Sequence, residues 1–575
     1  MKIYTNLTRI FQRFFNNFAP QFLHKNAISY HFLLGVSLFI ILWFYNDEVW
    51  LRVGEFIASN NESPFLKPLI FVAIFLLLWL MAEILCARIY AKIFIALLFI
   101  IAGIAGYFID LLHIAMNADI IGAVLQSDSR EVSDFLTPKI ALHLACFVGI
   151  PLVALCFIKI TKPPLKSAIL QKCAIIASLI VLISALYLVQ GKPIIMAFKN
   201  QKLIFVANPF APIRAVADYT IKVIRTPSTY TNLGDDAITS AKNKLFVLII
   251  GESARAQNFA HGGYERDTNP HTKNIKNLIY FSDFASCGVI TAISVPCMLT
   301  TYTHKNYKRN LSHYSDSLLD VAQKAGYETF WISNNGGVCI GGVCDRLNKE
   351  NVIYFNKQGQ LDGDMLATIE RVIAQHSQRF AKNANVGGGG NRLKQSNTLH
   401  SDSTSRDFKG ESNNTFIVIQ LLGSHGARYD LRYPKEFEIF APTCKNDVLG
   451  KCDKAHIRNA YDNSLIYTDF VVAQIIAMLQ SATAVDSTLW YISDHGESLG
   501  EYNQYMHGGL PYAIAPNAQT QVPSYFWFKN TKDLHYATLD ARKNRSYSQD
   551  FVFHTLLTLL EIRTKDYDKS LDMLE

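Results

Sequence analysis

Charged residues are scarce in this sequence. Only 18% of its 575 residues are charged, whereas 50% are hydrophobic and 12% are aromatic. Apolar side chains this abundant exclude a chain that is mainly disordered or fibrous. A dense basic face with interleaved aromatic residues is also lacking, and the net charge of +8 is small for this length, which argues against a nucleic-acid-binding protein. The mild basic surplus fits an acidic lipid surface as a partner instead.

Most of the excess of apolar residues lies in the first third of the chain, in five stretches that can each cross a membrane as a helix of about 20 residues. We place them at 28–46, 68–86, 92–112, 141–160 and 171–190. The alternative is a set of buried helices in a soluble protein, but five near-continuous apolar runs in succession disfavour it. The first stretch begins too late for a signal peptide and lacks a nearby small-residue cleavage site.

Lysine and arginine mark the side of the membrane on which each short loop lies. They gather before the first stretch, between the second and third, and between the fourth and fifth. The N-terminus is therefore predicted inside and the chain after about residue 191 outside. This gives a transmembrane domain over 1–191, a bridging connector over 192–242 along the membrane surface, and an outer domain over 243–575. The polar loop containing Glu131 would lie on the outer side, either near a lipid head group or as an ordinary solvated loop.

Six of the ten cysteines form close pairs in the segment predicted to lie outside. These pairs are Cys287/Cys297, Cys339/Cys344 and Cys444/Cys452. An even set of closely spaced cysteines in an oxidising compartment indicates three local disulfides. The alternative is a metal cluster, but the sequence lacks any CxxC pair.

The outer domain alternates between short β-branched runs and helical stretches. The runs 245–251, 415–423 and 488–494 are typical of buried parallel strands. Helical stretches lie between them, for example at 316–326 and 461–480, so we expect an α/β domain with a mostly parallel central sheet. The Gly-, Ser- and Asn-rich segment 383–414 has almost no large apolar residues and is predicted to be a flexible insertion.

Candidate metal ligands follow the predicted strands. Glu252 follows the first strand, His425 the second, and Asp494 and His495 the third, while His507 comes shortly after. Zinc accepts nitrogen and oxygen ligands of these types, and the ends of parallel strands meet at one edge of a sheet. Any one of these histidines could be a structural residue, but the five residues together favour a zinc site.

A hydroxyl nucleophile is available inside the Cys287/Cys297 loop. Thr291 comes before an apolar run, so it is expected at the start of a helix, where free N–H groups favour a phosphate. A metal ion would activate its hydroxyl. A helix-capping threonine is the structural alternative, and Ser294 is the rival nucleophile.

At these residues the chain resembles the bacterial phosphoethanolamine transferases that modify lipid A, a group that includes the colistin-resistance enzymes. The wider group is the alkaline phosphatase and sulfatase superfamily. The matching motifs are LIIGESAR, SCGVITAISVPCM, GSHG, YDNSLIYTD, SDHGESLGE and the later HG, PYAIAP and QVP segments. They span most of 243–560, and the five-span membrane domain matches as well. The resemblance implies an enzyme of the bacterial inner membrane with its catalytic domain in the periplasm.

The resemblance also implies a role for each candidate residue. It assigns the zinc ligands as Glu252, Thr291, Asp494 and His495, with one or two zinc ions, and Thr291 as the residue that receives phosphoethanolamine. His425 and His507 are implied to be catalytic and to hold the phosphate or a second zinc. Asn335 and Glu131 are implied to bind substrate. The donor would be phosphatidylethanolamine, the acceptor lipid A or the lipooligosaccharide core, and the outcome resistance to polymyxin and other cationic peptides.

The sequence departs from the family pattern at three positions. The loop that usually carries a substrate-binding lysine between two cysteines has Ile340-Gly341-Gly342, Ala123 replaces a usual asparagine, and Gln549 stands where a histidine is common. Phosphate binding near Ile340 must therefore differ, or another cation substitutes. Three alternatives stay open: a phosphoglycerol transferase with a related site, transfer to another surface acceptor such as a flagellar protein, and a membrane-anchored scaffold without activity.

Overall fold

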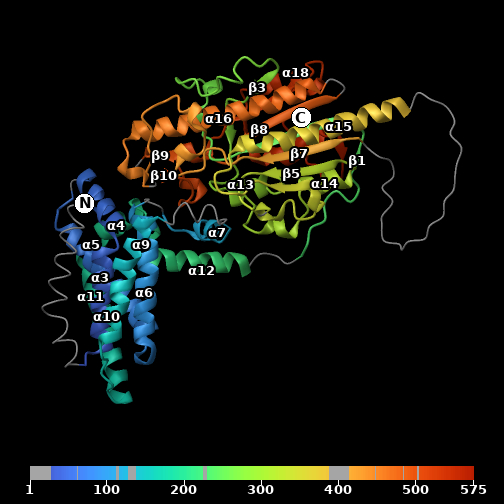
Figure 1. Ribbon diagram of the computed structural model, residues 1–575. Coiled ribbons are helices and arrows are strands. Elements are labelled where there is room, and N and C mark those ends of the chain that lie inside the picture. Colours follow the sequence, from blue (N-terminus) through green and yellow to red (C-terminus); the bar gives the residue numbers. More distant parts are fainter. Residues whose placement is uncertain are drawn as a thin grey trace. The chain divides into compact units, whose positions relative to one another are not determined.

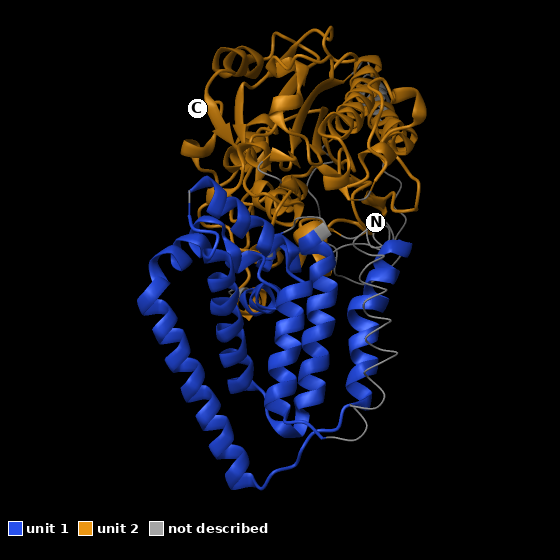
Figure 2. Ribbon diagram, turned by 90° about the vertical axis from the view of Figure 1, so that its left-hand side faces the viewer, with its two compact units in different colours: residues 1–121, 134–218 blue, residues 122–133, 219–575 orange. Residues whose placement is uncertain are grey.

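The computed structural model describes most of the chain. The described residues are 27–60, 62–111, 115–126, 137–224, 229–337, 339–386, 413–446, 448–482, 485–501 and 504–575. Glu131 and most of the predicted insertion 383–414 lie outside them. The chain divides into two compact units, residues 1–121 with 134–218 and residues 122–133 with 219–575 (Figure 2).

The first unit is a bundle of apolar helices. Its helices are α3 (Tyr30–Phe44), α4 (Asp47–Ser59), α5 (Leu66–Leu85), α6 (Ala91–Gly106), α9 (Pro138–Leu144), α10 (Ile150–Phe157) and α11 (Leu165–Asn200). Four continuous spans at 66–85, 88–110, 138–157 and 165–200 are long and apolar enough to cross a membrane, and α3 with α4 adds a fifth span that is bent by 64°. The five-span membrane domain predicted from the sequence is thus confirmed.

Polar side chains stabilise the bend between α3 and α4. Asn46 donates to the carbonyl of Asn208 at 3.0 Å, and its own Oδ1 accepts from Asn208 N at 2.7 Å. Asp110 Oδ1 accepts from the backbone N–H of Glu48 at 3.0 Å, in the first turn of α4. The N–H groups in the first turn of a helix have no partner within that helix. Asp110 supplies one for Glu48 and so caps α4 from another part of the chain.

The second unit is built on a seven-stranded sheet with the order β3-β11-β8-β2-β7-β5-β6. Its strands are β2 (Lys244–Gly251), β3 (Leu278–Tyr280), β5 (Glu328–Ser333), β6 (Val352–Tyr354), β7 (Thr415–Gln420), β8 (Asp486–Ser493) and β11 (Ser524–Phe528). The five strands from β8 to β6 are parallel to their neighbours, whereas β11 is antiparallel to both β8 and β3. This confirms the mostly parallel sheet, and β8, β7 and β5 are labelled in Figure 1.

Both faces of the sheet are buried. Phe246, Leu248 and Ile250 of β2 pack in one cluster with residues of α13 (Thr291–Met298), α14 (Leu318–Lys324) and α19 (Val552–Leu559). The alternate residues of β2, on the opposite face, are equally buried. A strand covered on both sides is apolar throughout, and this is why 245–251 is a continuous hydrophobic run.

One further helix has the length and composition of a membrane span. It is α16 (Lys454–Ser481), which lies in the second unit and packs against α15 (Leu366–Val386). Buried residues occur all along α16, so its apolar composition reflects a position in the interior of this unit. All three predicted disulfides are present, and the four cysteines of the first unit are free.

Candidate active site

The predicted ligands lie at the carboxyl ends of neighbouring strands. In the sheet β2 lies between β8 and β7, and the three strands end almost in register. Glu252 directly follows β2, and Asp494 and His495 directly follow β8. His425 lies in the loop that follows β7. The parallel arrangement therefore brings these residues to one edge of the sheet, where sites of α/β proteins form.

Thr291 and three ligands form the first group of the site. Thr291 Oγ1 donates to Glu252 Oε2 at 3.0 Å and lies 3.2 Å from His495 Nε2. His495 Nε2 in turn lies 3.5 Å from Glu252 Oε1 and 3.2 Å from Asp494 Oδ2. Glu252, Asp494 and His495 are almost completely buried, and their ligand atoms lie within 4.8 Å of one another.

The hydrogen bonds around this group leave one atom of His495 and one of Asp494 available to a metal. His495 Nδ1 lies 2.9 Å from the carbonyl of Gly496, so Nδ1 is the donor and Nε2 presents its lone pair to the carboxylates. Asp494 Oδ2 is buried, and no hydrogen-bond partner for it occurs in the described part of the chain. A buried imidazole nitrogen beside two carboxylates is a donor set that suits zinc.

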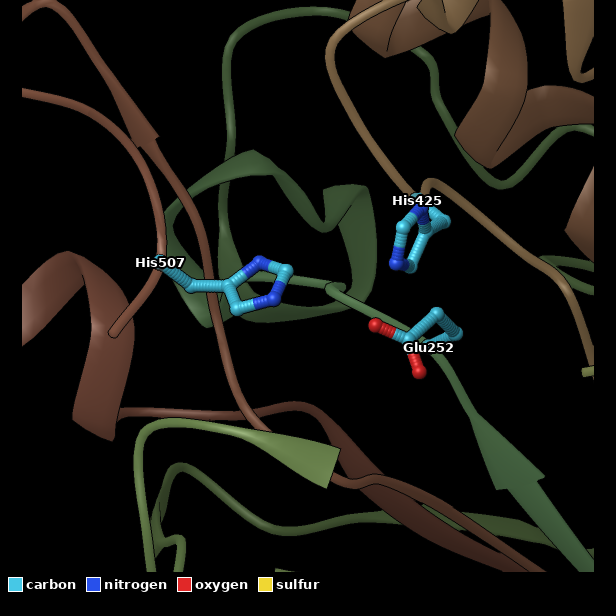
Figure 3. A group of neighbouring side chains, drawn as sticks. All are labelled: Glu252, His425 and His507. Atoms are coloured by element: carbon cyan, nitrogen blue, oxygen red, sulfur yellow. The ribbon is translucent and has the colours of Figure 1, made fainter. Parts of the chain in front are cut away.

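A second group shares Glu252 with the first. Glu252, His425 and His507 converge with ligand atoms within 4.8 Å of one another (Figure 3). The Nδ1 atom of His507 lies 2.7 Å from Glu497 Oε2, and Tyr429 donates to the other oxygen of Glu497 at 2.6 Å. Glu497 and Tyr429 therefore fix the orientation of the His507 ring.

Burial shifts three carboxyl groups and two imidazoles of the site toward their neutral forms. Burial and the nearby Asp494 raise the pKa of Glu252, and burial raises the pKa of Asp494 to about 6 and that of Glu497 to about 8. Burial lowers the pKa of His425 to about 4 and that of His507 to about 3. Neutral imidazoles can bind a cation, and a bound cation would favour the ionised carboxylates. The electrostatics of the site are consistent with a metal centre.

The two candidate nucleophiles differ in their surroundings. Thr291 is the first residue of α13 and makes the contacts with Glu252 and His495 given above. Ser294 lies one turn further along, and its buried Oγ has no hydrogen-bond partner among the described residues. Thr291 is also not the residue before the helix, because Ile290 occupies that position. The geometry supports Thr291 as the nucleophile.

Asn335, predicted to bind substrate, lies against a predicted ligand. Its Nδ2 donates to Glu252 Oε2 at 2.5 Å, and its backbone N–H donates to Ser333 Oγ at 3.1 Å. This contact holds the Glu252 carboxylate in place. Binding of substrate by Asn335 stays a prediction, and so does binding by Glu131, which lies outside the described residues.

The structure gives supporting roles to three residues for which the sequence did not predict those roles. Glu497 belongs to the same DHGE run as Asp494, but only the structure shows that it orients His507. Tyr429 begins the short 3-10 helix Tyr429–Leu431, in a segment with no recognisable sequence pattern. Gln549 departs from the family pattern, but its contacts with the backbone of Cys287, Ser493 and Asp494 appear only in the structure.

Two family models match the chain. The one described as Sulfatase matches residues 244–562, and the one described as Phosphoethanolamine transferase EptA/EptB matches residues 73–223. The phosphoethanolamine transferase EptA of Escherichia coli (strain K12) is 33% identical over 501 residues, which cover 84% of this chain and 85% of that protein. The phosphatidylethanolamine transferase Mcr-1 of Escherichia coli is 29% identical over 478 residues, which cover 81% of this chain and 83% of that protein.

Solved structures give the same picture of the fold. The integral membrane lipooligosaccharide phosphoethanolamine transferase A (EptA) of Neisseria meningitidis superposes with a TM-score of 0.82 and 24% identity, covering 96% of this chain and 99% of that one. The C-terminal periplasmic domain of phosphoethanolamine transferase EptC from Campylobacter jejuni is 36% identical, with a TM-score of 0.50, and covers 60% of this chain and 98% of that one. The likeness to the Neisseria structure extends over both units of the chain.

Proposed function

Because the chain belongs to the EptA family of phosphoethanolamine transferases, we propose that it moves phosphoethanolamine from phosphatidylethanolamine to lipid A, with Thr291 as the nucleophile. One observation carries this proposal: the Thr291 hydroxyl at the start of α13 contacts both Glu252 and His495. The backbone N–H groups of Thr291 and Ala292 at the start of this helix provide a site for the phosphoryl oxygens, whereas that of Ile293 donates to the Ile290 carbonyl.

In the first step, Thr291 Oγ1 attacks the phosphorus of phosphatidylethanolamine. A new oxygen–phosphorus bond forms at the threonine, the bond to the diacylglycerol oxygen breaks, and diacylglycerol leaves. Glu252 accepts the hydrogen bond of the Thr291 hydroxyl and is placed to take its proton. That proton ends on the diacylglycerol hydroxyl, so atoms and charge balance.

The donor set of the first group fits a zinc ion held by Glu252, Thr291, Asp494 and His495. Bound zinc would lower the pKa of the Thr291 hydroxyl and offset the charge that develops on the phosphoryl oxygens. His425 and His507, with the shared Glu252, form a second set that suits a second zinc or the phosphate.

In the second step, an oxygen of the acceptor attacks the phosphothreonine and Thr291 Oγ1 is released. With a phosphate of lipid A as acceptor, the attacking oxygen is already ionised, and the proton that Thr291 Oγ1 regains comes from water, because its original proton left on diacylglycerol in the first step. With a sugar hydroxyl of the lipooligosaccharide core as acceptor, a base must take the proton. His425 and His507 are suited to that role because burial keeps their imidazoles neutral at neutral pH.

The membrane unit fits an enzyme whose two substrates are lipids. Five spans anchor the enzyme in the bacterial inner membrane, and the lysine and arginine distribution puts the second unit on the periplasmic side. Both lipids then stay close to the site, which raises their effective concentration. Each transferred group adds an ammonium beside a lipid A phosphate, which weakens the attraction for polymyxin and other cationic peptides.

The test is to express the protein in a Gram-negative host with unmodified lipid A and to analyse that lipid by mass spectrometry. We expect a phosphoethanolamine increment with the unaltered protein and with Ser294→Ala, a matched hydroxyl control on the same helix, but not with Thr291→Ala. A phosphoethanolamine increment with Thr291→Ala at normal protein level would overturn the assignment of Thr291 as the nucleophile. A phosphoglycerol increment would show that the donor is not phosphatidylethanolamine and would favour the phosphoglycerol transferase alternative. An increment only on core sugars or a surface protein would replace lipid A as the acceptor.

A further inference from the structure

One buried side-chain amide, that of Gln549, connects the segment that leads to Thr291 with the segment that carries Asp494 and His495. Gln549 directly follows β12 (Ser546–Ser548) and is fully buried. Its Oε1 accepts from the backbone N–H of Cys287 at 2.6 Å. Its Nε2 donates to the carbonyls of Ser493 at 2.8 Å and Asp494 at 2.7 Å. All three hydrogen bonds go to the backbone, and they connect segments that are far apart in the sequence.

The first of these segments leads to the nucleophile. Cys287 lies four residues before Thr291 and is bonded to Cys297 near the other end of α13. Its carbonyl lies 2.9 Å from His304 Nδ1, so both the N–H and the C=O of Cys287 have partners. A displacement at Cys287 is therefore passed to Thr291 through a short, cross-linked segment.

The second segment carries two of the proposed zinc ligands. Ser493 is the last residue of β8, and Asp494 is the first residue beyond it. The Asp494 carboxylate accepts from the backbone N–H groups of Ser253 at 3.0 Å and His495 at 2.7 Å through its Oδ1 atom. Because Gln549 uses both of its N–H groups on these carbonyls, it fixes the backbone from which Asp494 and His495 project.

We propose that Gln549 is a positioning residue that sets the spacing between the Thr291 hydroxyl and the Asp494–His495 pair. The inference rests on the proposed function, since it takes Thr291 as the nucleophile and the pair as zinc ligands. A glutamine suits this role because its amide offers one acceptor oxygen and two donor hydrogens. A neutral imidazole offers one acceptor and one donor, and an apolar side chain offers neither.

Asn463 provides a matched control. It is a fully buried amide on α16 that also makes three hydrogen bonds, two of them to the backbone. Its Oδ1 accepts from Phe440 N at 2.8 Å, and its Nδ2 donates to the Phe440 carbonyl at 2.9 Å and to Tyr433 OH at 3.3 Å. Asn463→Leu removes as many hydrogen bonds from the interior as Gln549→Leu but does not touch the contacts of Thr291 with its neighbours.

The experiment uses the full-length protein in detergent with phosphatidylethanolamine as the donor. The variants are Gln549→Leu, Gln549→His, Asn463→Leu and Thr291→Ala. For each variant, kcat and KM are measured at saturating zinc, the rate of zinc loss to a chelator is followed, and the thermal midpoint of the metal-free protein is recorded.

We expect Gln549→Leu to lower kcat by about 10- to 100-fold and to speed zinc loss by a similar factor, as for other residues that orient metal ligands. The KM for the donor should change by less than about 2-fold, because the amide does not face the substrate. Gln549→His should recover most of the kcat, since it keeps an acceptor and a donor. Asn463→Leu should lower the thermal midpoint by about as much as Gln549→Leu does, but its kcat should equal that of the unaltered protein.

A wild-type kcat in Gln549→Leu would overturn the inference. An equal loss of kcat in Asn463→Leu would also overturn it, because general destabilisation would then explain both variants. Transfer activity in Thr291→Ala would instead refute the proposed function, whatever the Gln549 variants do.

Discussion

Replacement of Asn335 by alanine tests how the Glu252 carboxylate is held. Asn335 donates to Glu252 Oε2 at 2.5 Å, and Thr291 donates to the same oxygen at 3.0 Å. The other oxygen, Oε1, accepts from Ser253 Oγ at 2.7 Å. Asn335 and Glu252 are both buried, so water cannot easily replace the lost amide. Asn335→Ala therefore leaves the carboxylate with two side-chain donors in place of three.

The size of the effect follows from the charge of the acceptor. A hydrogen bond to an ionised group contributes roughly 1.5–3 kcal/mol. If all of it is lost from the transition state, kcat falls by about 10- to 150-fold. The remaining donors, Ser253 and Thr291, still restrain Glu252, so we expect the lower end of this range, a loss of about 10-fold in kcat.

The assay is the single-turnover formation of phosphothreonine, combined with steady-state kcat and KM for phosphatidylethanolamine. Because the amide faces Glu252, kcat should fall while KM changes by less than about 2-fold. Asn335→Asp is the companion variant. It has nearly the same shape but brings a second carboxylate against Glu252, so its loss of kcat should be larger than that of Asn335→Ala.

The opposite pattern would refute this reasoning. If KM for the donor rose about 10-fold in Asn335→Ala with kcat unchanged, the residue would act on substrate binding alone. That result would support substrate binding by Asn335, as the family resemblance implies, and would show that its contact with Glu252 does not affect catalysis.

Three further predictions concern the metal site and the stability of the second unit. Asp494→Asn should lower the zinc content of the purified protein by about 10-fold or more and abolish transfer, as measured by metal analysis and lipid A mass spectrometry. Glu497→Ala frees the His507 ring and should lower kcat by about 10- to 100-fold, and full activity would exclude its orienting role. His376 is buried, which lowers its pKa to about 4, against about 6.5 in an unfolded chain. Its contribution to stability is complete above pH about 6.5 and is lost as the pH falls toward 4, by at most about 3 kcal/mol, so the thermal midpoint should fall less between pH 7 and pH 5 in His376→Leu than in the unaltered protein.

Local sequence patterns predict those features of the fold that depend on a single segment of the chain. The membrane spans follow from hydropathy, and the disulfides join cysteines at most ten residues apart. The ligands at the ends of β2 and β8 were predictable because a buried parallel strand is a recognisable apolar run, and the polar residue after it lies at a defined edge of the sheet.

Features that depend on distant contacts were not predictable in this way. The 64° bend in the first span is stabilised by Asp110 and Asn208, which lie on other segments of the membrane unit. The antiparallel strand β11 is as apolar as the parallel strands of the sheet, so only its pairing with β8 and β3 reveals its direction. The contacts of Gln549 with Cys287 and Asp494 likewise join segments with no shared sequence pattern.

The loop Ile340-Gly341-Gly342 lacks the lysine that is usual in the family, and its packing explains why the two glycines are needed. Gly341 and Gly342 have φ values of +60° and +72°, which disfavour other residues at both positions. A Cβ atom on Gly341 would meet Pro296 of α13, and one on Gly342 would lie 2.5 Å from His313 Nδ1. The loop thus packs closely against the helix that begins with Thr291, so a lysine at Gly341 would displace that helix, whereas a lysine at Gly342 would meet His313. We infer that this loop supports the nucleophile helix, and that positive potential for the phosphoryl group comes from the N–H groups of α13 and a bound metal instead.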